Sequence, residues 1–154
     1  MVKILLDPSE LKQHEFSILL IYANNCHHCQ TIKPVFEQLE QDYGEEIQFF
    51  SAEINTVKSL YEQFAETQEA FGYETNDDGT PKQDASGNFI GTKLLNPDGT
   101  PQMVPKYVIP NFYVFAKEAI SDDDEFGFVG GFDGAAPGEL QVVLESLQLK
   151  ALGG

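Results

Sequence analysis

The stretch "LLIYANNCHHCQTIKP", residues 19–34, joins an apolar run to two cysteines at the start of a helical pattern. The run "FSILLIYA" (16–23) has strand length and no polar break after Ser17, which is typical of a central strand covered on both faces. From Cys26 onward, apolar residues recur every three or four positions, which predicts an amphipathic helix that ends at Gly44 and is kinked by Pro34. The apolar face consists of Ile32, Val35, Phe36, Leu39 and Tyr43.

Cys26 and Cys29 are the only cysteines of the chain, and His27 and His28 lie between them. A sulfur at a helix N-terminus meets unpaired backbone N–H groups, which favour the thiolate and lower the thiol pKa. Cys29 follows one helical turn later, where it can close a disulfide with Cys26 or resolve a mixed disulfide. The same spacing also occurs in zinc sites, but zinc needs further ligands, and His14 is the only other histidine. A redox pair is therefore the main hypothesis, with a metal site or two merely buried cysteines as alternatives.

Other patterns predict an α/β fold with a mixed central sheet and helices on both faces. Asp7, Pro8 and Glu10 indicate the start of a short helix that ends near His14. A second helix is expected to carry Val57, Leu60, Tyr61, Phe64 and Phe71 on one face. The remaining expected elements are strands at 2–6, 47–54, 111–116 and 126–132 and a last helix at about 138–149.

Residues 73–106 interrupt this order and are rich in Gly, Pro, Asn and Asp. The segments "NDDGTPK" (76–82) and "NPDGTPQ" (96–102) form a near-repeat, and each contains an Asp-Gly pair that favours a turn with positive φ. The segments "NFIG" and "TKLL" between them could pair as a short hairpin. We expect a single domain, 1–154, with an insertion at about 73–106 that is either a decorated loop or a partner-binding arm.

The charge of the chain limits its partners. Nine basic residues stand against 25 acidic ones, giving a formal charge of −16, which disfavours nucleic acid and anionic lipid. No apolar run approaches the ~20 residues that a membrane span needs, and the N-terminus lacks a secretory pattern, so we expect a cytoplasmic protein. The acidic turn "SDDDEF" (121–126) is expected to be the solvated turn of a hairpin between the strands at 111–116 and 126–132. Calcium binding is disfavoured, because the spacing of the carboxylates does not follow a calcium-binding loop.

Taken together, these motifs resemble the thioredoxin family over nearly the whole chain outside residues 73–106. The quoted stretch matches the family's strand, CxxC and kinked helix, including Tyr22, Ala23 and Pro34. In "VIPNFYVF" (108–115), Pro110 matches the family's cis-proline, and "GGFDGAAPGEL" (130–140) resembles the loop between the last strand and the last helix.

The resemblance implies roles for these residues. Cys26 would be the attacking thiol and Cys29 the resolving one. The backbone of Ile109, beside Pro110, would pair with an extended substrate segment as an added strand, with Tyr22 in the same substrate-binding region. The ring of Pro110 beside the sulfurs should discourage metal capture, so no metal or other cofactor is expected.

Three features depart from the thioredoxin pattern. His27-His28 replaces Gly-Pro, and an imidazolium near Cys26 would make the disulfide more oxidising. The family's buried Asp, six residues before the first cysteine, is Leu20 here. The family's buried Lys aligns with Glu53, which could take over as the proton acceptor or could point to solvent.

The resulting prediction is a thiol–disulfide oxidoreductase that acts through a Cys-His-His-Cys pair. Its partners would be protein disulfides or dithiols and a reductase or other redox partner. A reducing cytosol would favour reductase activity, whereas an oxidising compartment would favour oxidation or isomerisation. The alternatives are an adaptor that binds partners through the 73–106 arm and a metal-binding CHHC protein.

Overall fold

The computed structural model describes residues 1–134 and 137–153. The chain divides into two compact units. The first, here called the sheet unit, consists of Met1–Phe64 and Val108–Gly154. The second, here called the inserted unit, consists of Ala65–Tyr107, so it begins before Tyr73.

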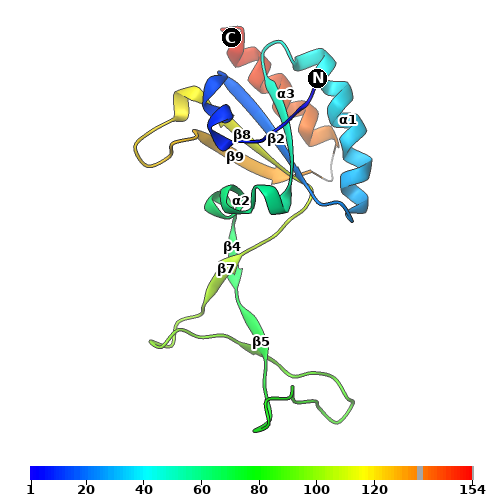
Figure 1. The fold of residues 1–154 in the computed structure, drawn as a ribbon, viewed down its shortest axis with the longest axis vertical. Helices are drawn as coiled ribbons and strands as arrows, with labels where there is room; N and C mark the ends of the chain where they lie inside the picture. The colour runs from blue at the N-terminus through cyan, green and yellow to red at the C-terminus, as the bar shows by residue number, and fades with distance from the viewer. Residues whose placement is uncertain (135–136, 154) are drawn as a thin grey trace. The chain divides into compact units, whose positions relative to one another are not determined.

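The sheet unit is built on five strands in the order β1-β3-β2-β8-β9, of which Figure 1 labels β2, β8 and β9. Strand β2 (Phe16–Tyr22) lies at the centre, parallel to β3 and antiparallel to β8, and β1 is parallel to β3. Strand β9 completes the sheet, antiparallel to β8. The other strands are β1 (Lys3–Ile4), β3 (Gln48–Glu53), β8 (Asn111–Ala116) and β9 (Phe128–Asp133).

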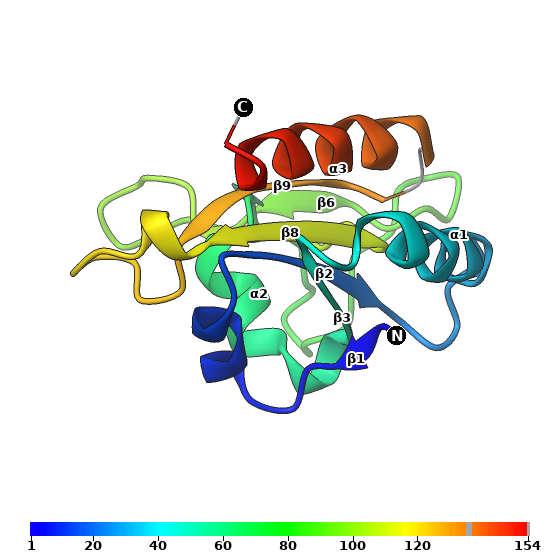
Figure 2. The same cartoon turned by 90° about the horizontal axis from the view of Figure 1, so that it is seen from above.

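Helices cover both faces of this sheet, as expected (Figure 2). Helix α1 (His27–Tyr43) and helix α3 (Pro137–Ala151) share one face, and α2 (Lys58–Phe64) lies on the other. Pro34 lies inside α1, and Asp7 and Glu10 form the expected capping box, although η1 (Pro8–Gln13) is a 3₁₀ helix. Two further 3₁₀ turns are η2 (Ile54–Thr56) and η3 (Lys117–Ala119).

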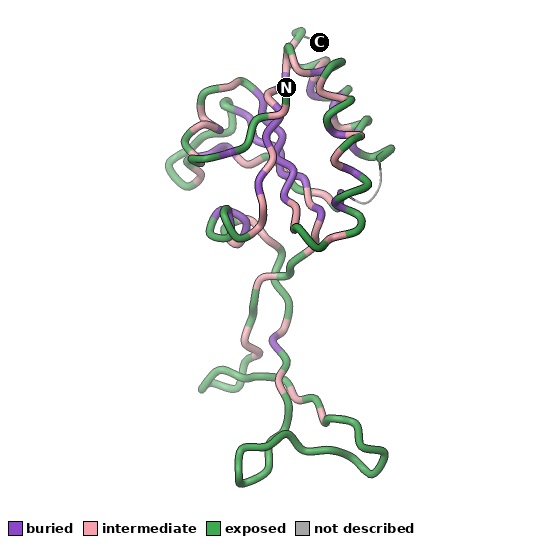
Figure 3. Tube along the Cα trace, turned by 45° about the vertical axis from the view of Figure 1, so that its right-hand side comes forward, coloured by how far each residue is buried: buried purple, intermediate pink, exposed green. Residues whose placement is uncertain are grey.

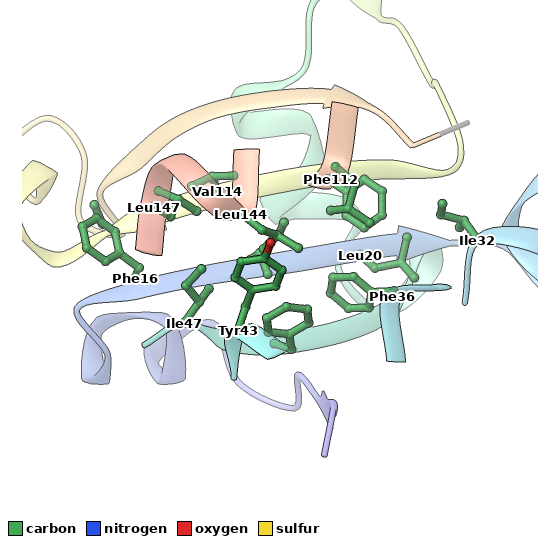
Figure 4. Close-up of a cluster of buried hydrophobic side chains, with 14 residues drawn as sticks. Phe16, Leu20, Ile32, Phe36, Tyr43, Ile47, Phe112, Val114, Leu144 and Leu147 are labelled. Carbon is green, nitrogen blue, oxygen red and sulfur yellow. The ribbon is translucent and has the colours of Figure 1, made fainter. Parts of the chain in front are cut away.

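The main core lies between the sheet and the pair α1 and α3. The central strands β2 and β8 are buried along most of their length (Figure 3), and the side chains of the core pack in one cluster (Figure 4). Phe36 contacts both Phe49 and Phe112, with ring centroids 4.8 and 5.3 Å apart. Leu20 is fully buried here, so an apolar side chain fills the position of the family's aspartate.

The acidic turn between β8 and β9 has a structural role. Asp124 accepts hydrogen bonds from the backbone N–H groups of Phe126, Gly127 and Phe128, at 3.2, 3.0 and 2.7 Å. One carboxylate therefore closes the hairpin that the acidic turn predicted.

Replacing Asp124 with alanine is expected to lower the free energy of unfolding by about 2 kcal/mol, because three backbone donors lose a charged acceptor. Urea unfolding measures this loss. Asp123→Ala is the matched control, because it removes the same charge from an exposed side chain one residue away. Equal stability of the two variants would contradict this role.

The inserted unit consists of two separate two-stranded ribbons. Strand β4 (Thr67–Glu69) pairs with β7 (Met103–Pro105), and β5 (Phe71–Tyr73) pairs with β6 (Gly91–Lys93), both antiparallel. Two predictions are therefore wrong. The second helix ends at Phe64, and Phe71 lies in β5, 66% exposed. "NFIG" does not pair with "TKLL", because Gly91–Lys93 runs through both segments as one strand.

Backbone hydrogen bonds, rather than a core, organise the inserted unit. At one junction, Ala70 N–H donates to Gln102, Gln102 N–H to Leu94, and Leu94 N–H to Ala70, closing a ring at 2.8, 2.9 and 3.0 Å. A second ring joins Glu74, Lys82 and Ile90 at 2.8 to 3.2 Å. Three tight turns extend from these rings, and their glycines, Gly79, Gly87 and Gly99, have φ between 84° and 88°. Two of these are the predicted Asp-Gly turns.

Each Asp-Gly turn is closed by its own aspartate. Asp78 Oδ1 accepts from the hydroxyl and the backbone N–H of Thr80, at 2.6 and 3.0 Å, and Asp98 makes the same pair of bonds with Thr100. Both hydrogen bonds lower the pKa of the aspartate that accepts them. The bond from the threonine hydroxyl has the larger effect, and the bond from the backbone N–H the smaller one. The repeated sequence therefore encodes a repeated turn.

Candidate active site

Cys26 and Cys29 lie where β2 passes into α1, as the sequence predicted. The chain leaves β2 at Tyr22, turns so that Cys26 N–H donates to Ala23 O at 3.3 Å, and starts the helix with Cys26 as its N-cap. The Cys26 sulfur accepts a hydrogen bond from Cys29 N–H at 3.1 Å. The two cysteines form a disulfide, with their Cα atoms 5.1 Å apart.

The two sulfurs have different environments. Cys29 is buried, with 1% of its surface exposed, whereas Cys26 is only partly buried. His27 and His28 are exposed, with ring centroids 5.9 Å apart. The first turn of α1 carries no Asp or Glu, so among these described residues no carboxylate opposes the positive end of the helix dipole. This end of the helix therefore suits a sulfur anion at Cys26.

The second landmark of the sequence also lies at this site. The Ile109–Pro110 peptide bond is cis, and the Ile109 carbonyl oxygen is 3.8 Å from the Cys26 sulfur. Pro110 is buried and accepts a hydrogen bond from Gly134 N–H at 2.9 Å. Within residues 1–134 and 137–153, no hydrogen bond is found for Ile109 N–H. The loop therefore presents backbone polar groups beside the sulfurs.

Side chains from other elements hold this loop. The Tyr61 hydroxyl accepts a hydrogen bond from Val108 N–H at 2.9 Å, and the Tyr113 hydroxyl donates to Tyr61 O at 2.8 Å. The two rings stack with centroids 5.5 Å apart. Burial raises the pKa of Tyr113 far above its usual value, so this donor keeps its proton across the physiological range. Glycine is needed at 134, because a Cβ there would lie 2.8 Å from the Phe112 ring and 3.2 Å from Pro110 Cβ.

Tyr22 lies at the end of β2, partly buried, and Lys33 Nζ sits 4.0 Å from its ring centroid. The ammonium group of Lys33 therefore lies against the ring of Tyr22, the residue that the thioredoxin resemblance assigned to the substrate-binding region. The contacts of Lys33 and Tyr61 were missed by the sequence reasoning, since each depends on which elements pack together.

For Glu53 the sequence left two alternatives open, a proton acceptor for Cys29 or a side chain that points to solvent. Its register partner on β2 is Tyr22, whereas Leu20 pairs with Ser51. Its carboxylate accepts from the backbone N–H and the side-chain amide of Asn55, at 2.9 and 3.0 Å, and so caps η2. This geometry favours a capping role for Glu53, because both hydrogen bonds join its carboxylate to the residue that follows in η2.

The structure brings no metal-binding cluster together in the part of the chain that it describes. No three His, Cys, Asp or Glu side chains converge there. His14, the remaining histidine considered as a ligand, lies against the Phe50 ring with centroids 5.9 Å apart, and burial lowers its pKa. In the described residues, no helix is both long and apolar enough to span a membrane.

Comparison with known proteins identifies the fold. No curated protein sequence matches the chain. A solved Malassezia sympodialis thioredoxin, Mala s 13, aligns with a TM-score of 0.58 and 14% identity, covering 96% of this chain and 91% of that one. Oxidised Plasmodium falciparum thioredoxin gives a TM-score of 0.56 at 17% identity, covering 95% and 97%. Thioredoxin f2, solved in complex with ferredoxin:thioredoxin reductase, gives a TM-score of 0.55 at 15% identity, and the alignment covers 94% of this chain and 93% of that one.

Fold and site together define a thioredoxin-fold protein with a CXXC pair at a helix start. The family model for thioredoxin matches residues 8–68, a range that contains both cysteines. This segment of the chain is thioredoxin-like in sequence, and the disulfide pair within it fits a thiol–disulfide oxidoreductase. The cis-proline loop lies outside the matched range. Within "GGFDGAAPGEL", residues 135 and 136 lie outside the described residues.

Proposed function

We propose that this chain exchanges disulfides with protein substrates through Cys26 and Cys29. The Cys26 thiolate attacks one sulfur of a substrate disulfide, and the other substrate sulfur leaves as a thiolate. The Cys29 thiolate then attacks the Cys26 sulfur, which forms the intramolecular disulfide and releases the second substrate thiolate. Two electrons pass from the dithiol to the substrate, and the same steps in reverse oxidise a substrate dithiol.

The observation that carries this assignment is the unequal exposure of the two sulfurs at the helix start. A substrate disulfide can approach Cys26, which is partly exposed and lies beside the N–H of Cys29. Cys29 is 1% exposed, so it reaches only a disulfide already formed on Cys26. Cys26 is therefore the attacking residue and Cys29 the resolving one.

The Ile109–Pro110 loop supports the binding of an extended substrate segment. The backbone N–H of Ile109 can donate to a substrate carbonyl, and the Ile109 carbonyl oxygen lies 3.8 Å from the Cys26 sulfur. A substrate strand that pairs with this residue holds its own sulfur near Cys26. The ring of Tyr22, carrying Lys33, is proposed as a further contact in the same region.

His27 and His28 tune the redox potential in this proposal. Both are exposed beside the cysteines, where imidazolium charge stabilises the thiolate and hence the reduced form. The double substitution His27→Gly, His28→Pro is expected to make the potential more negative by about 30 mV, a tenfold change in the equilibrium. Equilibration with glutathione measures it, with His14→Gln as the control. A less negative potential in the double variant would contradict the role of the histidines.

A dithiol partner must regenerate the reduced chain. The complex of thioredoxin f2 with ferredoxin:thioredoxin reductase shows a protein of similar fold with a reductase, which supports a reductase as the partner here. We propose that the chain works as a reductase in a reducing cytoplasm. In an oxidising compartment the same pair would introduce or rearrange disulfides.

Insulin reduction by dithiothreitol tests the proposal. The wild-type chain is expected to accelerate the precipitation of the reduced insulin chains well above the rate with dithiothreitol alone. An adaptor that keeps the fold without the chemistry would leave that rate unchanged.

A further inference from the structure

The inserted unit leaves most of its large apolar side chains exposed to solvent. Only Ala70 is buried among its apolar side chains, at 6% exposure, and the trace of this unit is almost wholly exposed (Figure 3). Its exposed large apolar side chains are Phe71, Tyr73, Phe89, Leu94, Leu95, Met103, Val104 and Tyr107, at 37% to 66%. Such a concentration of apolar surface marks an interaction site.

Three aromatic rings gather on one face of the β5–β6 ribbon. Phe71 and Tyr73 alternate with Gly72 and therefore point to the same face, and the Tyr73 and Phe89 rings are 5.6 Å apart. Gly91 is the register partner of Tyr73, and a Cβ there would meet only one backbone oxygen, at 4.0 Å. The space beside the Tyr73 ring is therefore open.

The opposite face of the ribbon is already covered. A Cβ at Gly72 would lie 3.0 Å from the Leu94 side chain, so Leu94 packs over this position. Glu69 and Lys93 form an ion pair at 3.0 Å, and Lys93 is the register partner of Phe71. The ion pair of Glu69 and Lys93 therefore bounds the aromatic face at the Phe71 end, whereas the face is open beside Tyr73.

We propose that this aromatic face, Phe71, Tyr73 and Phe89, binds an extended Lys- or Arg-bearing segment of a partner protein. A two-stranded ribbon is only marginally stable alone in water, and an added strand or packed segment stabilises it. The unit's acidic residues are Glu66, Glu69, Glu74, Asp77, Asp78, Asp84 and Asp98, against Lys82, Lys93 and Lys106. This charge attracts a basic segment, whose cations also bind aromatic faces.

The same charge disfavours the other occupants. A second copy of the chain carries the same formal charge of −16 and is repelled, as are nucleic acid and anionic membranes. The proposal concerns the inserted unit alone and holds whether or not the cysteines exchange disulfides.

Fluorescence anisotropy with two labelled unfolded chains tests this inference. Ribonuclease A, reduced and blocked with iodoacetamide, is the basic probe, and α-lactalbumin treated in the same way is the acidic one. Because neither probe has a free thiol, the wild-type chain can be used without disulfide exchange. The basic probe is expected to bind at least tenfold more tightly than the acidic one, and less tightly as salt is added.

Substitutions locate the binding surface. Phe71→Ser with Tyr73→Ser is expected to weaken binding of the basic probe at least tenfold. The matched control, Leu95→Ser with Met103→Ser, removes side chains of similar exposure (53% and 54%) elsewhere in the unit and should leave binding unchanged. Phe71→Tyr with Tyr73→Phe keeps both rings and should bind like the wild type, which separates loss of the surface from loss of folding.

Several results would overturn the inference: equal binding of both probes, unchanged binding in the serine variant, or lost binding in the ring-conserving variant. A dimer in analytical ultracentrifugation that disappears in the serine variant would make a second copy the occupant. Failure of the proposed redox function would appear separately, as absent insulin reduction by the wild-type chain.

Discussion

Insulin reduction is expected to fall to the rate of dithiothreitol alone when Cys26 is replaced with serine. The serine hydroxyl is not ionised at neutral pH, so no nucleophile remains at the helix start. Cys29 cannot replace it, because only 1% of its surface is exposed. The turbidity of precipitating insulin chains, followed with and without the variant, gives the measurement.

Cys29→Ser is the matched control, because it also removes the disulfide but keeps the attacking sulfur. This variant is expected to accumulate a mixed disulfide with a protein substrate, visible on a non-reducing gel and reversed by dithiothreitol. Cys26→Ser should form none. If Cys26→Ser trapped substrate and Cys29→Ser did not, the two roles would be exchanged. Full activity in both variants would place the reaction elsewhere in the chain.

The sequence predicted the sheet unit well because local patterns and packing agree there. The unbroken apolar run before Cys26 forms the buried central strand, and Ile32, Phe36 and Tyr43, spaced for one helix face, are buried in the core. The capping box at Asp7 and the Asp-Gly turns are also local, since each uses hydrogen bonds between residues only a few positions apart. Such features can be read from one short window.

The inserted unit was poorly predicted for the opposite reason. Its rings of hydrogen bonds join residues such as Ala70, Leu94 and Gln102, which no periodic pattern connects. Phe71 follows Phe64 by seven residues, a spacing that fits a helix face, yet Gly72 and the pairing with β6 place it in a strand. Hydrophobic periodicity misleads where backbone hydrogen bonds rather than a core determine the structure.

The active site combines features that a short stretch of sequence specifies with contacts between residues far apart in the chain. The helix start and the cis-proline follow from motifs, whereas the strand register that places Glu53 opposite Tyr22 is not specified by the sequence. The hydrogen bond from Val108 to Tyr61 joins residues 47 positions apart. The sequence therefore placed the two cysteines and Pro110 correctly and missed the side chains that hold the loop beside them.

Phe112→Ala is expected to lower the free energy of unfolding by about 3–5 kcal/mol, the largest stability effect proposed for this chain. Phe112 has 0% of its surface exposed, and its ring lies 5.3 Å from the Phe36 ring and 5.2 Å from the Phe132 ring. Alanine leaves a cavity between the sheet and α1 that these neighbours fill only in part. Urea unfolding followed by far-ultraviolet circular dichroism measures the loss.

Leu149→Ala is the control for this substitution, because Leu149 lies on α3 with 62% of its surface exposed. Its removal should change stability by less than about 1 kcal/mol. Phe112 also packs against Gly134, whose N–H holds Pro110, so the cavity reaches the loop beside Cys26. Insulin reduction should therefore fall in Phe112→Ala under conditions where the variant is still folded. Full activity there would show that the loop is held by Tyr61 and Tyr113 without support from the core.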